Sequence, residues 1–213
     1  MMPERPVDER PIVNQLREEY FDLLPDIRRV VFQLEAEIRY HTLSTLHKLK
    51  HYEQLVVKSR VKECESALKS LRRRQEGGTF DPERPGIYSL TSLPDLAGVR
   101  VLVFPRGVLN EVEGELHTRF TDWTPDPVRD ERGAVLAHKY FGKCFDVSSK
   151  IHAEYQVVPM LIGLYWDVEH SAIYKPTPTV KGKANSEPMK DLNAKVVRAL
   201  LDFEAEFERF VQD

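Results

Sequence analysis

Two kinds of hydrophobic periodicity alternate along this 213-residue sequence, and this alternation restricts the fold more than any other feature. From residue 12 to about residue 49, apolar residues recur every three or four positions, which predicts helix with one buried face. This gives two helices or one helix bent at Pro25, and we favour a break because proline is well tolerated in a first helical turn. Residues 99–104 form instead a dense β-branched run, which predicts a strand.

Turn residues divide the middle of the chain into shorter elements. Gly77 and Gly78 are expected to end a helix, and three prolines and a glycine mark residues 79–94 as a loop. Two apolar runs joined by residues 148–150 have a β-hairpin signature. The expected elements are a strand near 56–61, helices over 63–75 and 110–120, the second capped by Asn110, a strand over 99–104, a hairpin of 138–147 with 151–158, and a mostly buried helix over 160–174.

The last expected element is a long amphipathic helix over residues 189–211, with an inner face made of Val196, Leu200, Phe203, Phe207 and Phe210. A chain of 213 residues that is 41% hydrophobic can bury one good core and is short for two domains. We therefore expect a single domain over residues 1–213, with N-terminal helices over about 12–49 and a C-terminal helix over about 189–211.

Composition excludes several classes of protein. The two cysteines, Cys64 and Cys144, are too few and too far apart for a disulfide framework or a zinc ribbon, so we expect reduced thiols. No segment has the apolar core of a signal peptide, and no run approaches the roughly 18 apolar residues of a membrane span. We expect a cytoplasmic protein with no membrane partner. The net charge of −3 is unevenly distributed, because residues 48–74 are strongly basic and residues 202–208 are acidic.

The sequence has no Walker loop, GxGxxG, HExxH or GxSxG motif, so its chemistry must come from dispersed residues. The first group of such residues is basic. Arg60 and Lys62 alternate along an extended segment and share one face, which suits two cations that meet one polyphosphate. Lys69 and the run 72–74 follow on the next helix. The alternative is a solvated basic face with no ligand.

The second group opens the strongest predicted strand. Asp95 precedes it, and a carboxylate held at a strand end can bind Mg²⁺, which prefers oxygen ligands. The alternative is a turn-forming aspartate after Pro94. Arg100 lies inside this apolar strand and therefore needs a partner or a ligand.

The third group lies on the second arm of the hairpin and after it. Glu154 and Gln156 face the same side of an otherwise apolar strand, so two polar groups project together from the sheet. His170 and Tyr174 are four residues apart on a predicted helix and also share a face. A core histidine bonded to the backbone is the alternative for His170.

Together these motifs resemble the synthetase domain of the RelA/SpoT family, in particular its small stand-alone or toxic alarmone synthetases, over nearly the whole chain. The family makes ppGpp and pppGpp. The family's Arg-x-Lys followed by Ser stands here as Arg60, Lys62 and Ser66, its Asp-Leu/Ile-Ala-Gly-x-Arg as Asp95 to Arg100, and its Glu-x-Gln strand followed by Glu-His and Tyr-Lys as Glu154, Gln156, Glu169, His170, Tyr174 and Lys175.

The resemblance implies an α+β fold with a mixed, largely antiparallel sheet flanked by helices, like that of nucleotidyltransferases. It implies transfer of diphosphate from ATP to the 3′-hydroxyl of GTP or GDP, with Mg²⁺ as the cofactor. In the implied site Arg60, Lys62 and Lys69 hold ATP phosphates, and Arg100 or Arg106 packs on adenine. Asp95 and Glu154 bind Mg²⁺, and Glu154 or a neighbour accepts the proton of the attacking hydroxyl. The acceptor is bound by Lys139, Tyr140, Gln156, His170 and Lys175.

The sequence departs from the family mainly on the acceptor side. Where the family has Gly-Tyr-Arg-Ser-x-His, residues 139–144 match best, with Tyr140 kept and Cys144 at the histidine position. Val158 replaces an arginine and Ser70 replaces a lysine. These departures leave the acceptor open between guanine nucleotides, adenine nucleotides and the 3′ end of tRNA. They also leave open a degenerate nucleotide-sensing or partner-binding module. Self-association and an antitoxin partner are left undecided by the sequence.

Overall fold

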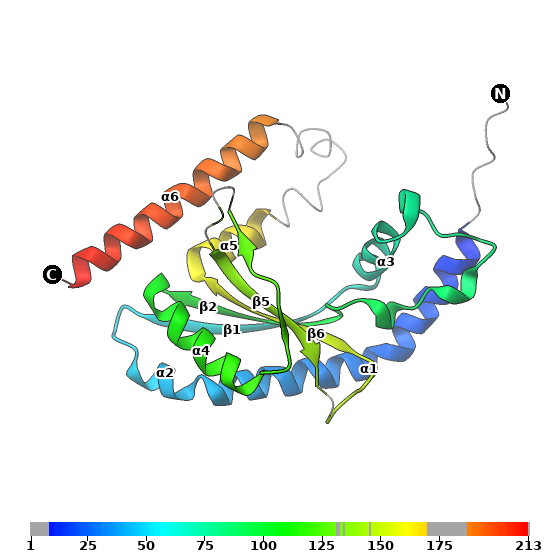
Figure 1. Cartoon of the computed structure of the whole chain (residues 1–213), viewed down its shortest axis with the longest axis horizontal. Coiled ribbons are helices and arrows are strands. Elements are labelled where there is room, and N and C mark those ends of the chain that lie inside the picture. Colours follow the sequence, from blue (N-terminus) through cyan, green and yellow to red (C-terminus); the bar gives the residue numbers. More distant parts are fainter. Residues whose placement is uncertain (1–8, 131–132, 134, 145, 170–186, 213) are drawn as a thin grey trace.

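A computed structural model describes residues 9–130, 133, 135–144, 146–169 and 187–212 (Figure 1). His170, Tyr174 and Lys175 lie outside the described residues. The helices are α1 (Arg10–His41), α2 (Leu43–Lys48), α3 (Cys64–Arg73), α4 (Leu109–Arg119), α5 (Met160–Glu169) and α6 (Glu187–Gln212), and the strands are β1 (Gln54–Val61), β2 (Ala97–Phe104), β3 (Thr124–Pro125), β4 (Val128–Arg129), β5 (Val135–Lys143) and β6 (His152–Pro159).

The strands form one sheet in the order β1-β2-β6-β5-β3, with β4 also paired to β5. Only the central β2–β6 pair among these is parallel, and the other pairs are antiparallel. The predicted hairpin is the β5–β6 pair. This mixed, largely antiparallel sheet flanked by helices confirms the predicted α+β class.

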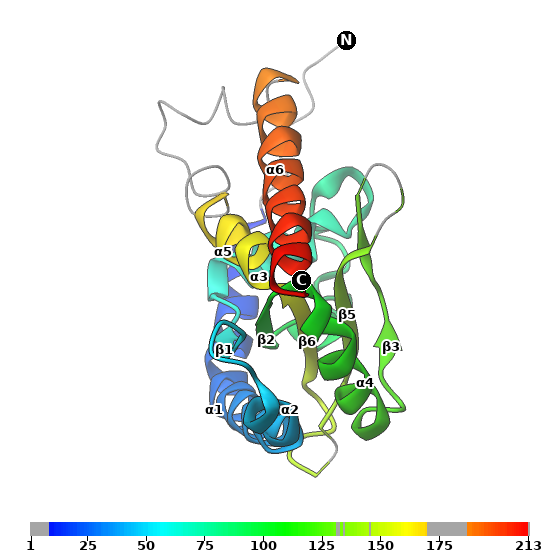
Figure 2. The ribbon, with the colours of Figure 1, turned by 90° about the vertical axis from the view of Figure 1, so that its left-hand side faces the viewer.

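Helices cover both faces of the sheet, with α1 on one side and α5 and α6 on the other (Figures 1 and 2). Alternation of side chains along β2 divides the core accordingly. Val99, Val101 and Val103 are buried in the larger cluster with α1, whereas Leu102 packs against Ile162 of α5 in a smaller cluster. Each central strand therefore contributes to two packed layers.

The predicted break at Pro25 is wrong, because α1 continues through it for 32 residues. Proline inside a helix removes one backbone hydrogen bond and costs about 3 kcal/mol. Burial on both sides of Pro25 outweighs this cost, since Leu16, Tyr20, Ile27 and Leu34 all lie in the core. The tertiary contacts of the helix, not its local propensity, keep it continuous.

One smaller expectation also fails. Asn110 does not cap α4, because the helix begins one residue earlier and its N-cap position is Val108. The loop over residues 79–94 includes two short 3₁₀ turns, and its apolar side chains are anchored in the core, with Phe80, Leu90 and Leu93 at most 1% exposed.

The inner face of α6 is rotated relative to the prediction. Phe203 and Phe210 are exposed, whereas Val197 and Leu200 pack against the smaller core cluster, and Glu204 is buried. Burial, and then the nearby Glu208, raises the pKa of the Glu204 carboxyl to about 7. The helix therefore buries the carboxyl group of Glu204, whereas the sequence pattern predicts burial of the preceding residue, Phe203.

The helix α5 approaches the sheet closely at Gly163. A Cβ atom at this position would lie 2.3 Å from Cδ2 of Leu102, so only glycine fits. The expected burial of α5 is incomplete, since Leu164 and Val168 are 41% and 63% exposed. The close approach nevertheless fixes α5 over β2 and β6, where it forms one wall of the pocket described next.

Candidate active site

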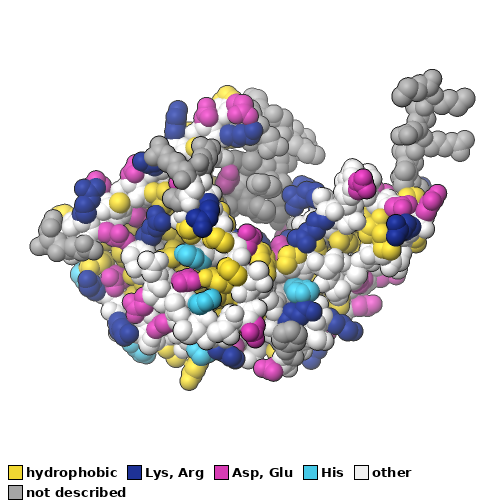
Figure 3. All heavy atoms as spheres, in the orientation of Figure 1, with side chains coloured by type: hydrophobic (Ala, Val, Ile, Leu, Met, Phe, Trp, Pro, Cys, Tyr) yellow, Lys and Arg dark blue, Asp and Glu magenta, His cyan; other side chains and the backbone are white. Residues whose placement is uncertain are grey.

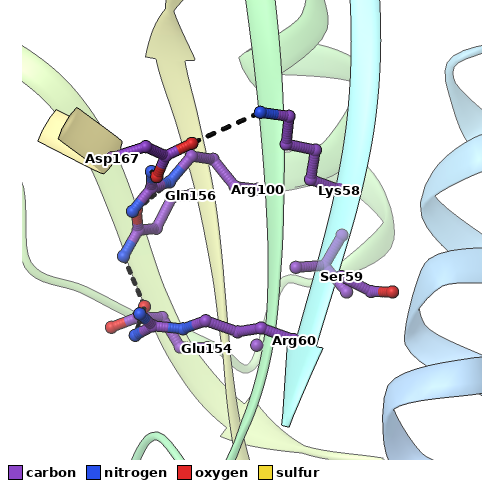
Figure 4. Close-up of a pocket in the computed structure, with 9 residues that line it drawn as sticks. Lys58, Ser59, Arg60, Arg100, Glu154, Gln156 and Asp167 are labelled. Atoms are coloured by element: carbon purple, nitrogen blue, oxygen red, sulfur yellow. Dashed lines mark hydrogen bonds and ion pairs between the residues drawn. The ribbon is translucent and has the colours of Figure 1, made fainter. Parts of the chain in front are cut away.

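A cavity of about 220 Å³ opens on the α5 side of the sheet, over strands β1, β2 and β6 (Figure 4). Its walls are mostly polar and charged, although the strands that form its floor are apolar on their other face. The lining residues are Lys58, Ser59, Arg60, Gly98, Val99, Arg100, Glu154, Gln156 and Asp167.

Strand register arranges the pocket side chains in two rows across the sheet. Arg60 of β1 is in register with Gly98 of β2, which is in register with Glu154 of β6. The second row lies two residues along and is Lys58, Arg100 and Gln156. Because residues two apart on a strand face the same side, both rows point into the same cavity.

Gly98, in the middle of the first row, allows Arg60 to reach Glu154 across the strand between them. A Cβ atom at Gly98 would lie 3.3 Å from Cγ of Arg60, so the arginine side chain lies directly over the glycine backbone. In this position Arg60 Nη2 reaches to 3.8 Å from Oε1 of Glu154. Lys139 approaches from β5, with Nζ 3.8 Å from Oε2 of the same glutamate. A nearly buried carboxylate, 6% exposed, thus lies between two cations.

The second row is connected by hydrogen bonds. Arg100 Nε donates to Oε1 of Gln156 at 3.0 Å, and the Gln156 amide donates to Glu154. Arg100 Nη1 also donates to Oδ1 of Asp167 at 2.7 Å, and Lys58 Nζ donates to Oδ2 of Asp167 at 3.3 Å. Arg100 therefore has the partners that its place in an apolar strand requires, and its guanidinium links β6 to α5.

Lys62 and Asp95 form a second polar pair beside this pocket. Lys62 Nζ lies 2.5 Å from Oδ2 of Asp95, and the backbone N–H of Lys62 donates to the Leu96 carbonyl. The other oxygen, Oδ1 of Asp95, is buried and has no hydrogen-bond partner in the part of the chain that the structure describes. Asp95 lies just before β2, and Glu154 lies near the start of the parallel strand β6, so both carboxylates lie at the same end of the central strand pair.

Two residues predicted to contact ATP lie elsewhere. Lys69 is on α3 and lines a separate hollow against α1. Arg106 follows the other end of β2, where Nη2 donates to the Val135 carbonyl at 2.8 Å. An eight-residue strand spans roughly 26 Å, so Arg106 is separated from Asp95 by the length of β2. In the structure, Arg100 is the predicted adenine-packing residue that lies in the pocket.

Tyr140 faces away from the pocket. It is in register with Tyr155, its ring stacks on that of Tyr155 with centroids 4.7 Å apart, and its hydroxyl donates to Glu113. Burial and this hydrogen bond raise the Tyr140 pKa above its ordinary value. The pocket side of β5 presents Phe141, which is in register with Glu154, and Lys139, whose Nζ lies 5.2 Å from the Phe141 ring centroid.

Sequence reasoning gave no role in the pocket to Lys58 or Asp167. The alternation that selects Arg60 and Lys62 also selects Lys58, two residues earlier on the same strand face. Asp167 has no such local signal, since it lies on an otherwise mostly apolar helix. Only the packing of α5 over the sheet brings its carboxylate to Arg100 and Lys58.

No protein-family model matches this sequence, and no curated protein matches it. Solved structures do resemble it. The crystal structure of the small alarmone synthetase 1 from Bacillus subtilis has a TM-score of 0.62 to this chain at 18% sequence identity, over 92% of this chain and 98% of that chain. This chain has the small alarmone synthetase fold.

Two other structures share this fold. A GTP pyrophosphokinase family protein from Streptococcus pneumoniae has a TM-score of 0.61 and 22% identity, over 91% of this chain and 95% of that chain. The smu.1046c protein from Streptococcus mutans UA159 has a TM-score of 0.64 and 20% identity, over 88% and 93%. The fold implied by the sequence motifs is thus confirmed over most of the chain. Among the helices that the structure describes, none is long and apolar enough to cross a membrane.

Proposed function

We propose that this chain is an ATP-dependent pyrophosphokinase, which transfers the β,γ-diphosphate of ATP to the 3′-hydroxyl of GTP or GDP and so produces pppGpp or ppGpp. One observation carries the proposal. Three cationic side chains, those of Lys58, Arg60 and Arg100, line one cavity together with the carboxylate of Glu154, and a fourth, Lys139, lies 3.8 Å from that carboxylate.

This arrangement suits the charge of the substrates. ATP and a guanine nucleotide bring several negative charges into a small space, and phosphoryl-type transfer depends mainly on positioning and on neutralising that charge. Arg60 and Lys62 are the proposed ligands of the ATP phosphates. Arginine is suited to two-point contact with phosphate oxygens, and Arg60 lies over a glycine that leaves space above the strand.

The donor set fits a magnesium ion that is shared with substrate phosphates. No group of three or more His, Cys, Asp or Glu side chains within the described residues is gathered to hold a metal alone. Mg²⁺ commonly takes one or two protein carboxylates together with phosphate oxygens and water. Asp95, whose Oδ1 lacks a partner within the described residues, and Glu154 would hold it, and the ion would offset charge on the β- and γ-phosphates.

The proposed reaction is a displacement at phosphorus. The 3′-oxygen of the acceptor forms a bond to the β-phosphorus of ATP, and the bond from that phosphorus to the oxygen shared with the α-phosphate breaks. AMP leaves with the electron pair. Glu154 takes the proton of the 3′-hydroxyl and returns it to solvent. Arg60 and Lys139 each lie 3.8 Å from a carboxylate oxygen of Glu154 and so hold this side chain in position for the transfer.

Structures with the same fold support the choice of substrates. The small alarmone synthetase 1 from B. subtilis has been solved bound to AMPCPP, and also bound to its product pppGpp. AMPCPP is an ATP analogue, so that protein holds an ATP-like donor and a guanine product. We transfer both ligand classes to this chain as part of the proposal.

The tRNA 3′ end and adenine nucleotides are the alternative acceptors. The basic stretch 48–74 gives limited support to RNA, because its members are spread over both ends of β1. Lys48 precedes the strand and lies 3.5 Å from Glu111, whereas Arg72 lies on α3, 2.9 Å from Glu9. A guanine nucleotide therefore remains the proposed acceptor. A degenerate module that binds nucleotide without transfer is the second candidate function, favoured by the burial of Tyr140.

The test is an incubation of the purified protein with Mg²⁺ and γ-labelled ATP, with GTP, GDP, ATP or deacylated tRNA supplied in turn. Label on GTP or GDP, with one AMP released for each transfer, is the expected result. Label on tRNA, or on a product that carries the diphosphate on the 3′-hydroxyl of ATP, would show that the acceptor is not a guanine nucleotide. No transfer to any acceptor, together with normal AMPCPP binding, would select the sensing module.

Two variants connect the activity to the site. Glu154→Gln keeps the shape and a hydrogen-bonding partner for Gln156 but cannot accept a proton or hold a metal ion as a carboxylate does. We expect transfer to fall by at least about 10³-fold with an unchanged thermal transition. The matched control is Glu76→Gln, because Glu76 is exposed and lies outside the cavity. Full activity in Glu154→Gln would remove Glu154 from the mechanism.

A further inference from the structure

The row of side chains that begins at Arg60 continues across the sheet beyond the cavity. Glu154 of β6 is in register with Phe141 of β5, and Phe141 is in register with Thr124 of β3. Side chains that lie opposite each other on neighbouring strands have their Cβ atoms roughly 5 Å apart. Phe141 is therefore the cross-strand neighbour of Glu154 on the side away from Arg60.

The cavity itself ends at β6. Its lining residues come from β1, β2, β6 and α5, and none of them belongs to β5. Figure 2 shows α5 on the β1 side of the sheet, with β5 and β3 at the other edge. Figure 3 views the molecule from that edge and shows acidic and basic side chains interspersed on it. The sheet thus offers a second area, over β5, on the other side of Glu154.

The proposed transfer needs two nucleotides that meet at Glu154. The cavity and its cations are assigned to ATP, and Glu154 takes the proton of the 3′-hydroxyl of the acceptor. Since both substrates have to reach this carboxylate at once, the acceptor approaches it from the β5 side. Its ribose then lies at Glu154 and its base lies over β5, where the ring of Phe141 faces the same side of the sheet.

Two charged groups lie beside the Phe141 ring. Nζ of Lys139 lies 5.2 Å from the centroid of the ring and 3.7 Å from Oδ2 of Asp126. The backbone N–H of Asp126 donates to the Lys139 carbonyl at 2.8 Å, so the pairing of β3 with β5 holds Asp126 at this place. The Asp126 side chain is 64% exposed and Phe141 is partly exposed, so a ligand can reach both.

A flat ring beside a carboxylate suits a guanine base. Stacking on an aromatic side chain holds any base, because every base has a π face. A carboxylate adds selectivity, since its two oxygens accept hydrogen bonds from two adjacent donors. Guanine has such a pair, its N1–H and its N2 amino group, whereas adenine has an acceptor at N1 and no amino group at C2.

We propose that Phe141 and Asp126 bind the base of the acceptor, with guanine stacked on the Phe141 ring and its N1–H and N2 amino group donating to the Asp126 carboxylate. This inference rests on the proposed function, because it concerns the acceptor of the same reaction. It gives Phe141 the acceptor-binding role that the sequence motif implies for Tyr140, whose ring stacks on Tyr155 on the opposite face of β5. Lys139 lies between Asp126 and Glu154 and holds both in position.

The first experiment measures binding of GTP to protein saturated with AMPCPP, by calorimetric titration. Phe141→Ala should raise the dissociation constant of GTP by about tenfold or more, because stacking on the ring is lost. Phe141→Tyr keeps the ring and should bind like the wild type. The matched control is Phe32→Ala, since Phe32 is an exposed aromatic residue on α1, 75% exposed.

The affinity for AMPCPP should be the same in all four proteins, because none of these substitutions touches the cavity assigned to ATP. Unaltered GTP binding in Phe141→Ala would overturn the proposal. Equal losses of GTP and AMPCPP affinity would also overturn it, since they would assign Phe141 to the fold and not to the acceptor site.

The second experiment tests recognition of the base by comparing GTP with ITP, which lacks the N2 amino group. The wild type should bind GTP about tenfold more tightly, because only GTP donates twice to Asp126. Asp126→Ala should bring the two dissociation constants within about twofold of each other. The matched control is Asp122→Ala, because Asp122 is an exposed carboxylate that lines a hollow beside α1. Equal affinities in the wild type, or an unchanged preference in Asp126→Ala, would overturn the proposal.

These titrations need no turnover, so they separate this inference from the proposed function. GTP binding that depends on Phe141 and Asp126, with no transfer of label from γ-labelled ATP, would contradict the proposed function and support the base site. Transfer of label to GTP, with titrations that neither substitution changes, would overturn the base site alone. An absence of GTP binding to the AMPCPP-bound protein would overturn it as well.

Discussion

The two faces of the central strands β2 and β6 have opposite characters although they belong to the same backbone. On the α1 side Val99, Val101, Tyr155 and Val157 are at most 2% exposed and pack in the main core. On the α5 side Arg100, Glu154 and Gln156 meet in the candidate active site, whereas Leu102 and Val158, farther along the same face, pack in the smaller core cluster. Alternation along a strand thus separates stability from chemistry by a single residue. The following changes test how complete that separation is.

The largest effect is expected on the pocket face. Arg60→Ala should lower kcat/KM for the transfer by about 10³-fold, because it removes a cation that neutralises phosphate charge. The Arg60 side chain is about half exposed, so the midpoint of thermal unfolding should hardly change. Steady-state kinetics beside calorimetry measure both quantities. A large loss of stability would show that the two faces are not separable at this residue.

The buried carboxyl of Glu204 should cost stability at neutral pH. Its pKa is raised from 4.5 to about 7, so the folded state holds a proton that the unfolded state has lost. The penalty is absent below about pH 4.5, grows as pH rises and is complete above about pH 7, where it reaches about 3 kcal/mol. Glu204→Gln should therefore be the more stable protein above pH 7, with no difference at pH 4.

Urea unfolding of both proteins between pH 4 and 9 measures this difference. The control is Asp202→Asn, because Asp202 is an exposed carboxylate on the same helix, 65% exposed, and should give a difference near zero at every pH. A Glu204→Gln curve parallel to that of the wild type would show that the carboxyl titrates normally.

A substitution on the core face should lower stability and leave activity nearly unchanged, which is the reverse of the effect expected on the pocket face. Val101→Ala removes two methyl groups from a fully buried site and should lower the free energy of unfolding by about 2 kcal/mol. Activity per folded molecule should stay within about twofold of the wild type. Chemical denaturation and kinetics at low temperature make the comparison, and a tenfold loss of activity would show coupling through the strand.

The smallest effect is expected at Tyr155. Its hydroxyl is buried without a hydrogen-bond partner in the described residues, so Tyr155→Phe should be neutral or stabilise by up to about 1 kcal/mol. The matched variant is Tyr20→Phe, which loses a hydrogen bond of 2.8 Å to the Lys62 carbonyl and should destabilise by a similar amount. Equal destabilisation by both would show that Tyr155 has a partner.

Most strands and helices could be predicted because they depend on local hydrophobic period. The hairpin, the strand at residues 99–104 and the closing helix all appear close to their expected positions. The continuation of α1 through Pro25 could not be predicted in this way, because its stability comes from residues packed far away in sequence. Helix propensity is a weak guide wherever burial on both sides opposes it.

The pocket shows the same division. Arg60, Arg100, Glu154 and Gln156 could be selected from the sequence because alternation assigns each to a strand face. Tyr140 could not be placed, since the β5–β6 register decides which β5 side chains face the cavity. A shift of one residue in register exchanges the two faces, and in this structure it is Phe141 that faces Glu154.

The sequence by itself determined the class of fold, the order of its elements and the polar residues of the central strands, because these depend on periodicity along the chain. Tertiary structure alone decided that Asp167 joins Arg100, that Lys69 and Arg106 lie elsewhere, and which side of α6 is buried. A helix with apolar residues on more than one side packs through the side that fits the surface beneath it. That surface is built from residues distant in sequence.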